Sequence, residues 1–355
     1  MRSAFVRAAT LALLIPTVLP AQRPTTAADV KRILYPLADD SMKGRMTGSA
    51  GEAMAARFIA SQMKAIGLTP LGDSGYFQRV PTAVIPLNPP RRGRTERVML
   101  LGSFADRDTF PATQRRTSVN VLGLLEGSDA TLKNEIVLVD AHFDHVGVGQ
   151  AVNGDSIYNG ADDDASGTTA VLEIARQLSQ GARPKRTVLF VTTTGEEAGL
   201  LGTRWFIDHP PIPLSQFVAN MEIEMIGRPD SLAGGAGKAW LTGYERSNMG
   251  EQLAAAGIPI GPDKRPDQHF FERSDNIAFA RKGIVAHTLS TFNLHTDYHQ
   301  PSDDVSKADL DHMAAVINAA ARAVRVLADG PKPAWKPGGQ PGAPTPRSAA
   351  PPPAR

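Results

Sequence analysis

The stretch that decides the fold begins at Val139-Asp-Ala-His-Phe-Asp-His-Val-Gly-Val-Gly149 and, after a short spacer, continues as Asn159-Gly-Ala-Asp-Asp-Asp-Ala-Ser-Gly167. An apolar run leads into His142, and the second half opens into a helical pattern. If the run is a strand, His142 and Asp144 share a face, because alternate residues of a strand point the same way. Imidazole and carboxylate groups at the end of a buried strand indicate a metal site, and zinc accepts such ligands. The alternative is a core pair that satisfies itself.

Three consecutive aspartates, Asp162, Asp163 and Asp164, carry more charge than a turn needs. Adjacent carboxylates repel one another unless a cation or a helix N-terminus compensates them. A helix cap would use only one aspartate. The excess therefore favours a bound cation at this turn.

The composition narrows the kinds of site that the chain can build. It has 355 residues, of which 42% are hydrophobic and 21% charged, as is typical of a globular protein with a substantial core. Cysteine is absent, so any transition metal must be held by His, Asp and Glu. Residues 1–21 and 331–355 hold six of the 38 basic residues and no acidic one, which leaves 32 basic against 36 acidic residues in the body. This mildly acidic body does not indicate nucleic-acid binding.

The two ends of the chain differ from its body. Residues 1–21 combine Arg2 and Arg7 with a short apolar run and a cleavage-like Leu19-Pro20-Ala21, which predicts a signal peptide. The run is too short and too interrupted by proline to span a membrane, although an uncleaved anchor is the alternative. We therefore expect a periplasmic or secreted protein without stable membrane insertion after cleavage. Residues 331–355 are rich in proline and lack acids, which predicts an extended, disordered tail.

Helical and strand patterns alternate through residues 22–330, which we interpret as one domain. Helices are expected within 26–67, around a glycine-containing turn at 43–48, and at 165–178, 199–207 and 309–327. Strands are expected at 118–125, 135–140, 187–192, 217–223 and 284–289, and an exposed loop at 86–95. This order predicts an α/β three-layer sandwich, with a mixed, mostly parallel central sheet flanked by helices. Sites in such sheets gather at the carboxyl ends of the strands.

Three further stretches place acids or histidines at strand ends. They are Thr192-Thr-Thr-Gly-Glu-Glu-Ala-Gly-Leu-Leu-Gly202, Asn220-Met-Glu-Ile-Glu-Met-Ile-Gly227 and His295-Thr-Asp-Tyr-His-Gln-Pro-Ser-Asp-Asp304. In the first, one glutamate can bind a metal while its neighbour takes a proton from water, although a solvated pair opening a helix is the alternative. In the second, Glu222 and Glu224 share one face of an apolar strand, where unpaired burial would be costly.

Together, and in this order, these motifs resemble the M28 family of zinc metallopeptidases, which includes secreted bacterial aminopeptidases. The resemblance covers about residues 118–310. It implies two Zn²⁺ ions with Asp163 as the bridge between them, and a cis peptide bond between Asp163 and Asp164. The implied ligands are His142, Asp163 and Glu224 for one zinc and Asp163, Glu197 and His299 for the other.

The same resemblance implies a reaction. Glu196 matches the general base that takes a proton from metal-activated water, Asp144 the residue that orients His142, and Tyr298 a tyrosine that stabilises the oxyanion in some relatives. The implied protein is a secreted di-zinc aminopeptidase that hydrolyses N-terminal residues from a peptide substrate. Its preferred N-terminal residue and its oligomeric state are left open.

The sequence departs from the family pattern at two positions and leaves alternatives. Glu224 stands where aspartate is usual, and Asn276 stands where histidine is common, so metal spacing and substrate contacts can differ there. The remaining histidines are interpreted as structural or surface residues, with His269 and His295 as candidates for pocket lining; they are His145, His209, His269, His287, His295 and His312. Alternative functions are a one-zinc glutaminyl cyclase, a carboxypeptidase or dipeptidase of the same family, and a non-catalytic binding module.

Overall fold

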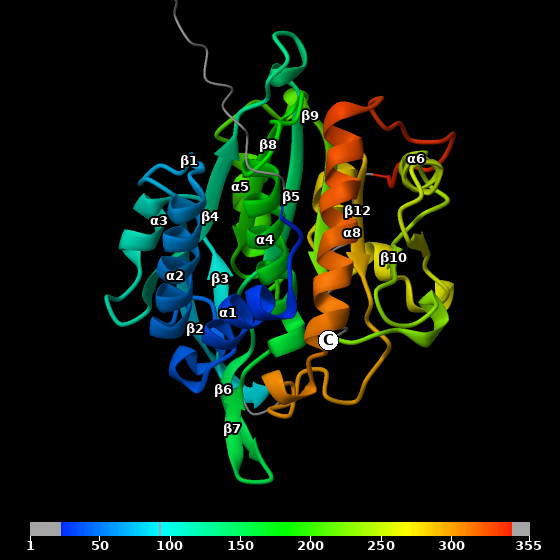
Figure 1. The fold of residues 1–355 in the computed structure, drawn as a ribbon. Coiled ribbons are helices and arrows are strands. Elements are labelled where there is room, and N and C mark those ends of the chain that lie inside the picture. The colour runs from blue at the N-terminus through cyan, green and yellow to red at the C-terminus, as the bar shows by residue number, and fades with distance from the viewer. Residues whose placement is uncertain (1–22, 92–93, 343–355) are drawn as a thin grey trace, which may run out of the picture.

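A computed structural model describes residues 23–91 and 94–342 of the chain. The predicted signal peptide at 1–21 and residues 343–355 of the predicted tail lie outside the described residues. A ten-stranded mixed sheet forms the middle layer, with strand order β11-β10-β12-β9-β5-β8-β4-β2-β3 and with β1 paired to β4 (Figure 1). The strands are β1 (Thr69–Pro70), β2 (Phe77–Arg91), β3 (Arg94–Leu100), β4 (Arg115–Leu125), β5 (Ile136–His142), β8 (Thr187–Thr193), β9 (Phe217–Glu224), β10 (Ala239–Leu241), β11 (Ile260–Pro262) and β12 (Ala286–Ser290).

Helices cover both faces of this sheet. One face packs against α1 (Ala27–Leu37), α2 (Ala50–Ile66), α4 (Gly167–Ser179) and α8 (Leu310–Asp329), and the other packs against α5 (Leu201–Asp208) and α7 (Asn276–Arg281). Figure 1 shows the first group side by side in front of the sheet. Two further short helices are α3 (Phe104–Thr109) and α6 (Met249–Ala255). The predicted three-layer α/β architecture is confirmed.

Alternation along β5 explains why both faces are covered. Val137 and Val139 belong to the apolar cluster under α4 and α8, whereas Ile136 and Leu138 belong to the cluster under α5 and α7. A strand buried on both faces is apolar throughout, which is why this stretch reads as a continuous hydrophobic run.

Four parallel strands form the middle of the sheet. Strands β8, β5, β9 and β12 are mutually parallel neighbours, and β10 is parallel to β11. The N-terminal strands β1, β2, β3 and β4 pair antiparallel, and so do β10 and β12. The carboxyl ends of the four central strands therefore meet at one edge, where the functional residues lie.

One-turn elements and a separate hairpin surround this edge. The hairpin is β6 (Gly147–Val152) with β7 (Asp155–Tyr158), which replaces the spacer expected between the two halves of the decisive stretch. The single turns are η1 (Asp40–Arg45), η2 (Leu132–Asn134), η4 (Leu214–Gln216), η5 (Ser231–Ala233), η6 (Pro266–Gln268), η7 (Phe270–Glu272) and η8 (Val305–Lys307), and a π-helical turn, η3, spans Ala161–Ser166. None of the helices in the described residues is both long enough and apolar enough to cross a membrane.

The expectation of an exposed loop at 86–95 was wrong, because this segment continues the β2–β3 hairpin. Pro86 pairs with Glu96 and Arg91 with Arg94, and the register shifts between Pro86 and Arg91. Proline cannot donate a ladder hydrogen bond, but edge strands and irregular register tolerate it. These prolines lie in β2 beyond Ala83, where β2 no longer pairs with β4, so they do not interrupt the interior of the sheet.

The first part of the predicted disordered tail was also wrong. Trp335 forms a β-bridge with Ser247, and its indole nitrogen donates to the carbonyl of Gly283 at 3.1 Å. Lys336 forms an ion pair with Glu251 at 2.7 Å. A large aromatic side chain can bury area against the domain, which the proline content of the segment conceals.

Candidate metal centre

The five predicted ligands come together at the carboxyl ends of the central strands. His142 is the last residue of β5, Glu224 is the last residue of β9, and Glu197 follows the end of β8. Asp163 lies in η3, and His299 lies in the loop after β12. The parallel register of β5, β8 and β9 brings three of these residues to one edge, which the sequence could predict because each follows an apolar run.

Two groups of donor atoms share Asp163. In the first, one donor atom each from His142, Asp163 and Glu224 lies within 4.8 Å of the others. Nε2 of His142 is 3.2 Å from Oδ1 of Asp163. The second group meets the same 4.8 Å limit and contains His145, Asp163, Glu197 and His299.

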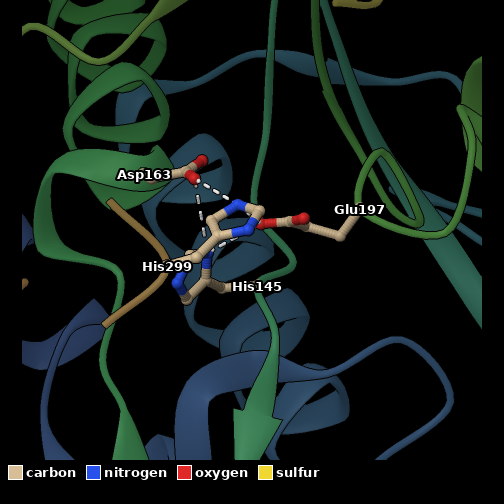
Figure 2. A group of neighbouring side chains, drawn as sticks. All are labelled: His145, Asp163, Glu197 and His299. Atoms are coloured by element: carbon tan, nitrogen blue, oxygen red, sulfur yellow. Dashed lines mark ion pairs between the residues drawn. The ribbon is translucent and has the colours of Figure 1, made fainter. Parts of the chain in front are cut away.

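Figure 2 shows the four side chains of the second group pointing toward one another. Nε2 of His299 lies 2.9 Å from Oε1 of Glu197 and 3.0 Å from Oδ2 of Asp163. His145 reaches the same glutamate oxygen with Nδ1 at 3.0 Å. His145, which the sequence left as a structural or surface residue, is thus buried and lies at this donor group.

The donor atoms are close together, yet several of them make no hydrogen bond of acceptable geometry. Among the described residues, Nε2 of His142, Nε2 of His299 and Oε1 of Glu197 are buried without a hydrogen-bond partner. Buried polar atoms normally have hydrogen-bond partners, because a buried atom without one loses its hydration and gains no hydrogen bond in exchange. Imidazole nitrogens and carboxylate oxygens aimed at shared points suit zinc. The residues present therefore fit a metal at each group.

The electrostatics of the centre point the same way. Burial and the neighbouring Glu222 raise the pKa of Glu224 to about 8. Burial lowers the pKa of His299, but the carboxylates of Asp163 and Glu197 outweigh it and raise this pKa to about 10. Burial raises the pKa values of Asp163 and Glu197, but the neighbouring imidazoles in turn outweigh it and lower them, so this group of side chains stabilises positive charge.

The three aspartates of the decisive stretch have different partners. Oδ1 of Asp164 accepts hydrogen bonds from the amides of Gly167 at 2.8 Å and Met225 at 3.0 Å. Asp162 accepts from the amide of Gly227 and from Nε2 of His295 at 2.8 Å. Only Asp163 belongs to the donor groups, and the Asp163–Asp164 peptide bond is cis, as the resemblance implied.

Asp144 connects the first histidine to the loop that carries the predicted base. Nδ1 of His142 hydrogen bonds to the backbone carbonyl of Asp144 at 3.1 Å, and the Asp144 carboxylate is 3.7 Å from the same nitrogen. Oδ1 of Asp144 accepts from the amide of Glu196 at 3.1 Å, and Oδ2 accepts from the Thr47 hydroxyl at 3.0 Å. The contact with His142 thus runs mainly through the main chain of Asp144.

Glu222 and Glu224 lie on the same strand but have separate environments. Glu222 accepts hydrogen bonds from the amides of Asp275 and Asn276 and from the Thr288 hydroxyl, at 3.0, 2.9 and 2.6 Å. It is therefore a satisfied buried carboxylate below the centre. Asn276 is itself fully buried, with its side-chain amide on the carbonyl of Phe271, which is a structural role for this departure from the family pattern.

A cavity opens beside the first donor group. Its lining includes Glu196 and Glu224 together with a set of aromatic side chains, which are Trp240, Phe270, Phe292 and Tyr298. The Tyr298 ring stacks on His299 with centroids 3.9 Å apart, and burial and the nearby carboxylates raise the pKa of its hydroxyl above its usual value. The described lining does not include His269 or His295, the two histidines considered for that position.

Arg45 supports the centre from the N-terminal part of the chain, which the sequence reasoning missed. It is fully buried, and its guanidinium donates to the carbonyls of Leu37, Phe143, Asn159 and Gly160 at 2.6–2.8 Å. These bonds join the two halves of the decisive stretch to α1. A planar fork of five donors is specific to arginine, so only the presence of this arginine in a glycine-containing turn could have suggested it.

The sheet and the buried imidazole–carboxylate centre define an α/β protein with a candidate metal site at the carboxyl ends of its parallel strands. Residues 120–324 match the sequence model of peptidase family M28, and the chain belongs to that family. The resemblance predicted from the sequence motifs is thereby confirmed.

Curated relatives of the chain include peptidases of quite different length. Aminopeptidase YwaD of Bacillus subtilis is 25% identical over 310 residues, which cover 77% of this chain and 65% of the relative. Leucine aminopeptidase 2 of Trichophyton equinum is 29% identical, covering 50% of this chain and 34% of the relative. A vacuolar membrane protease of Sclerotinia sclerotiorum is 26% identical, covering 59% and 18%. The chain thus spans less than two thirds of the length of these relatives.

Solved structures of similar fold include more than one kind of enzyme. A zinc aminopeptidase from Bacillus subtilis, BSAP, superposes with a TM-score of 0.61 at 16% identity, covering 86% of this chain and 96% of that chain. A glutaminyl cyclase from Porphyromonas gingivalis superposes with a TM-score of 0.57 at 15% identity, covering 84% and 97%. The fold alone does not choose between these activities.

Proposed function

We propose that the protein is a di-zinc aminopeptidase that removes N-terminal residues from peptides. The observation that carries the proposal is the pair of donor groups that share Asp163 beside Glu196 and an aromatic cavity. His142, Asp163 and Glu224 would hold one zinc, and Asp163, Glu197 and His299 would hold the other. When bound, zinc lowers the pKa of a water molecule and polarises a carbonyl oxygen.

Glu196 is the general base of the proposed reaction. It lines the cavity next to Glu224, and its backbone is fixed by the hydrogen bond to Asp144. Burial raises the pKa of Glu196 well above its usual range. A carboxylate with a raised pKa accepts a proton from water more readily and can then pass it to the leaving amine.

Tyr298 and the aromatic walls of the cavity bind the reacting end of the peptide. The raised pKa of Tyr298 keeps its hydroxyl protonated, so that it can donate to the oxyanion that forms on the scissile carbonyl. The aromatic side chains favour an apolar or aromatic N-terminal side chain. The carboxylates of Glu196 and Glu224, which line the cavity, attract the free amine of the peptide, which favours exopeptidase action.

A panel of aminoacyl-nitroanilides and peptides, free or N-acetylated, tests this proposal. We expect hydrolysis of the free-amine substrates, loss of that hydrolysis with a chelator, and its return with zinc. Cleavage of N-acetylated peptides but not of free-amine ones would contradict aminopeptidase action. Such a result would favour the carboxypeptidase or dipeptidase alternatives.

Glutaminyl cyclisation is the second candidate, since a cyclase shares the fold. It needs one zinc, whereas this chain brings together two complete donor groups. Metal analysis of the purified protein separates the two functions. Two zinc ions per chain support the peptidase, and one zinc together with release of pyroglutamate from an N-terminal glutaminyl peptide supports the cyclase.

The proposed place of action is the periplasm or the exterior of the cell. The support for it is the sequence of residues 1–21, which has the order of charge, apolar run and small residue typical of a signal peptide. N-terminal sequencing of the exported protein tests this. A mature chain that begins near residue 22 is expected, and a retained N-terminus would contradict it.

A further inference from the structure

His145 lies at the second donor group in a fixed position. Its side chain is buried, at 1% exposure, and its ring meets that of His299 edge to face, with centroids 5.4 Å apart. A Cβ added at Gly160 would come within 2.5 Å of the His145 ring, which shows how closely the backbone there approaches it. Packing on both sides leaves the imidazole little freedom to turn away.

The imidazole of His145 has close neighbours but no hydrogen bond. Nδ1 is 3.0 Å from Oε1 of Glu197 and 3.8 Å from Oδ2 of Asp163. Neither ring nitrogen has a hydrogen-bond partner among the described residues. A buried imidazole without a partner is costly, and a cation placed between Nδ1 and the two carboxylates would remove that cost.

We propose that His145 is a ligand of the second zinc, so that this ion has four protein ligands while the first has three. The proposal rests on the di-zinc centre of the proposed function and adds to it a difference between the two ions. The four donor residues are His145, Asp163, Glu197 and His299, and Figure 2 shows them converging. Zinc with four protein ligands is typical of closed structural sites, whereas three ligands leave a position open for water or substrate.

The cavity independently supports this difference between the two zinc ions. Its described lining includes Glu224 of the first group and Glu196, but it includes none of the four donors of the second group. The open position therefore belongs to the zinc that His142 and Glu224 would hold. The second zinc, with His145, holds Asp163 and Glu197 in place and is the more tightly bound of the two.

The test compares His145→Phe with His209→Phe. Phenylalanine keeps the ring that packs on His299 but has no donor nitrogen. His209 is an exposed histidine whose ring stacks on Trp205 at 3.7 Å, outside both donor groups, so the same substitution there is the control. Zinc content and affinity are measured by mass spectrometry during competition with graded chelators, and cobalt-substituted protein reports the coordination number in its visible spectrum.

We expect two zinc ions in the wild type, of which one is released much later than the other. His145→Phe should weaken the tighter ion by at least about 10- to 100-fold, the loss usual for removing even a supporting partner of a ligand. The four-coordinate cobalt signal of that ion should change, and His209→Phe should match the wild type. Unchanged affinity and an unchanged cobalt spectrum in His145→Phe would overturn the proposal.

Two further measurements keep the outcome interpretable. If His145→Phe does not fold by circular dichroism, His145→Ala, which relieves any crowding, is titrated instead under the same criterion. The nitroanilide assay on the wild type is independent of this titration. A wild type that binds two metals with His145-dependent affinity but cleaves no peptide would refute the proposed function and leave the ligand assignment standing.

Discussion

The backbone amide of Glu196 donates a hydrogen bond to Oδ1 of Asp144 at 3.1 Å, which ties the loop after β8 to the loop after β5. The same aspartate meets His142 through its own carbonyl. One residue therefore sets the distance between the proposed base and the first proposed ligand. The resemblance implied only the second of these contacts.

Replacing Asp144 tests whether this link positions the base. Asp144→Ala leaves the Glu196 amide without its acceptor, and we expect kcat/KM to fall about 10- to 100-fold, as for other residues that support a metal site. Asp144→Asn keeps an acceptor oxygen and should recover part of the loss. Equal activity of the alanine variant and the wild type in steady-state kinetics would contradict the positioning role.

Replacing Glu196 separates proton transfer from metal binding. Glu196→Ala removes the proposed base but no proposed ligand, so kcat should fall about 100- to 10,000-fold while two zinc ions stay bound. Turnover and metal content are measured on the same preparation. An active variant that retains both ions would refute the assignment of the base, and loss of one ion would instead make Glu196 a ligand.

Arg45→Lys tests the support from the N-terminal part of the chain. Lysine keeps the charge but cannot reach four carbonyls, so several buried acceptors lose their partner, and we expect a loss of about 3–5 kcal/mol in the free energy of unfolding. Urea titration followed by circular dichroism measures it. Arg79→Lys is the matched control, since Arg79 forms an exposed ion pair with Asp73 and should change stability by less than about 0.5 kcal/mol.

His287 should make stability depend on pH. Burial lowers the pKa of His287 to about 4, so the folded protein keeps this imidazole neutral while the unfolded chain protonates it below about pH 6.5. Because the unfolded state then binds more protons, this contribution to stability is complete above pH 6.5 and is lost as the pH falls toward 4. The slope is at most about 1.4 kcal/mol per pH unit.

Urea titrations at pH 7 and pH 5 measure this effect. His287→Gln retains a polar side chain beside Ser247 and the Thr242 carbonyl but cannot titrate. The difference in unfolding free energy between the two pH values should shrink in this variant. A difference as large as that of the wild type would exclude His287 as its source.

The sequence predicted the positions of those residues that lie next to a recognisable pattern of apolar residues. His142, Glu197 and Glu224 each end or follow an apolar strand pattern, and the rule that sites gather at the carboxyl ends of parallel strands places them together. Asp163 precedes a helical pattern instead, and the family resemblance implied its role. The four central strands and the covering helices α1, α2, α4, α5 and α8 were predicted from local periodicity, whereas α7 was not. The roles of these residues as ligands stay predictions until metal is measured.

The contacts that could not be predicted are made by residues outside regular helices and strands or by residues far apart in the sequence. His145 comes three residues after His142, so alternation along a strand would turn it to the opposite face. However, β5 ends at His142, and alternation does not apply beyond it. Arg45 contacts Phe143 across 98 positions of sequence, and Trp335 packs from within a proline-rich segment. No local pattern carries such contacts.

The hydrogen bonds of Arg45 also determine how short a fragment of this protein can be while it keeps the geometry of the centre. Residues 120–324 contain every proposed ligand and the proposed base, but they exclude Arg45 and also Thr47, which holds the Asp144 carboxylate. A fragment with those limits would contain every proposed catalytic and ligand residue but would lack the hydrogen bonds of Arg45 and Thr47, which fix the loops that position them. Researchers who trim the chain for expression or for grafting the centre onto another scaffold should therefore keep the two N-terminal helices.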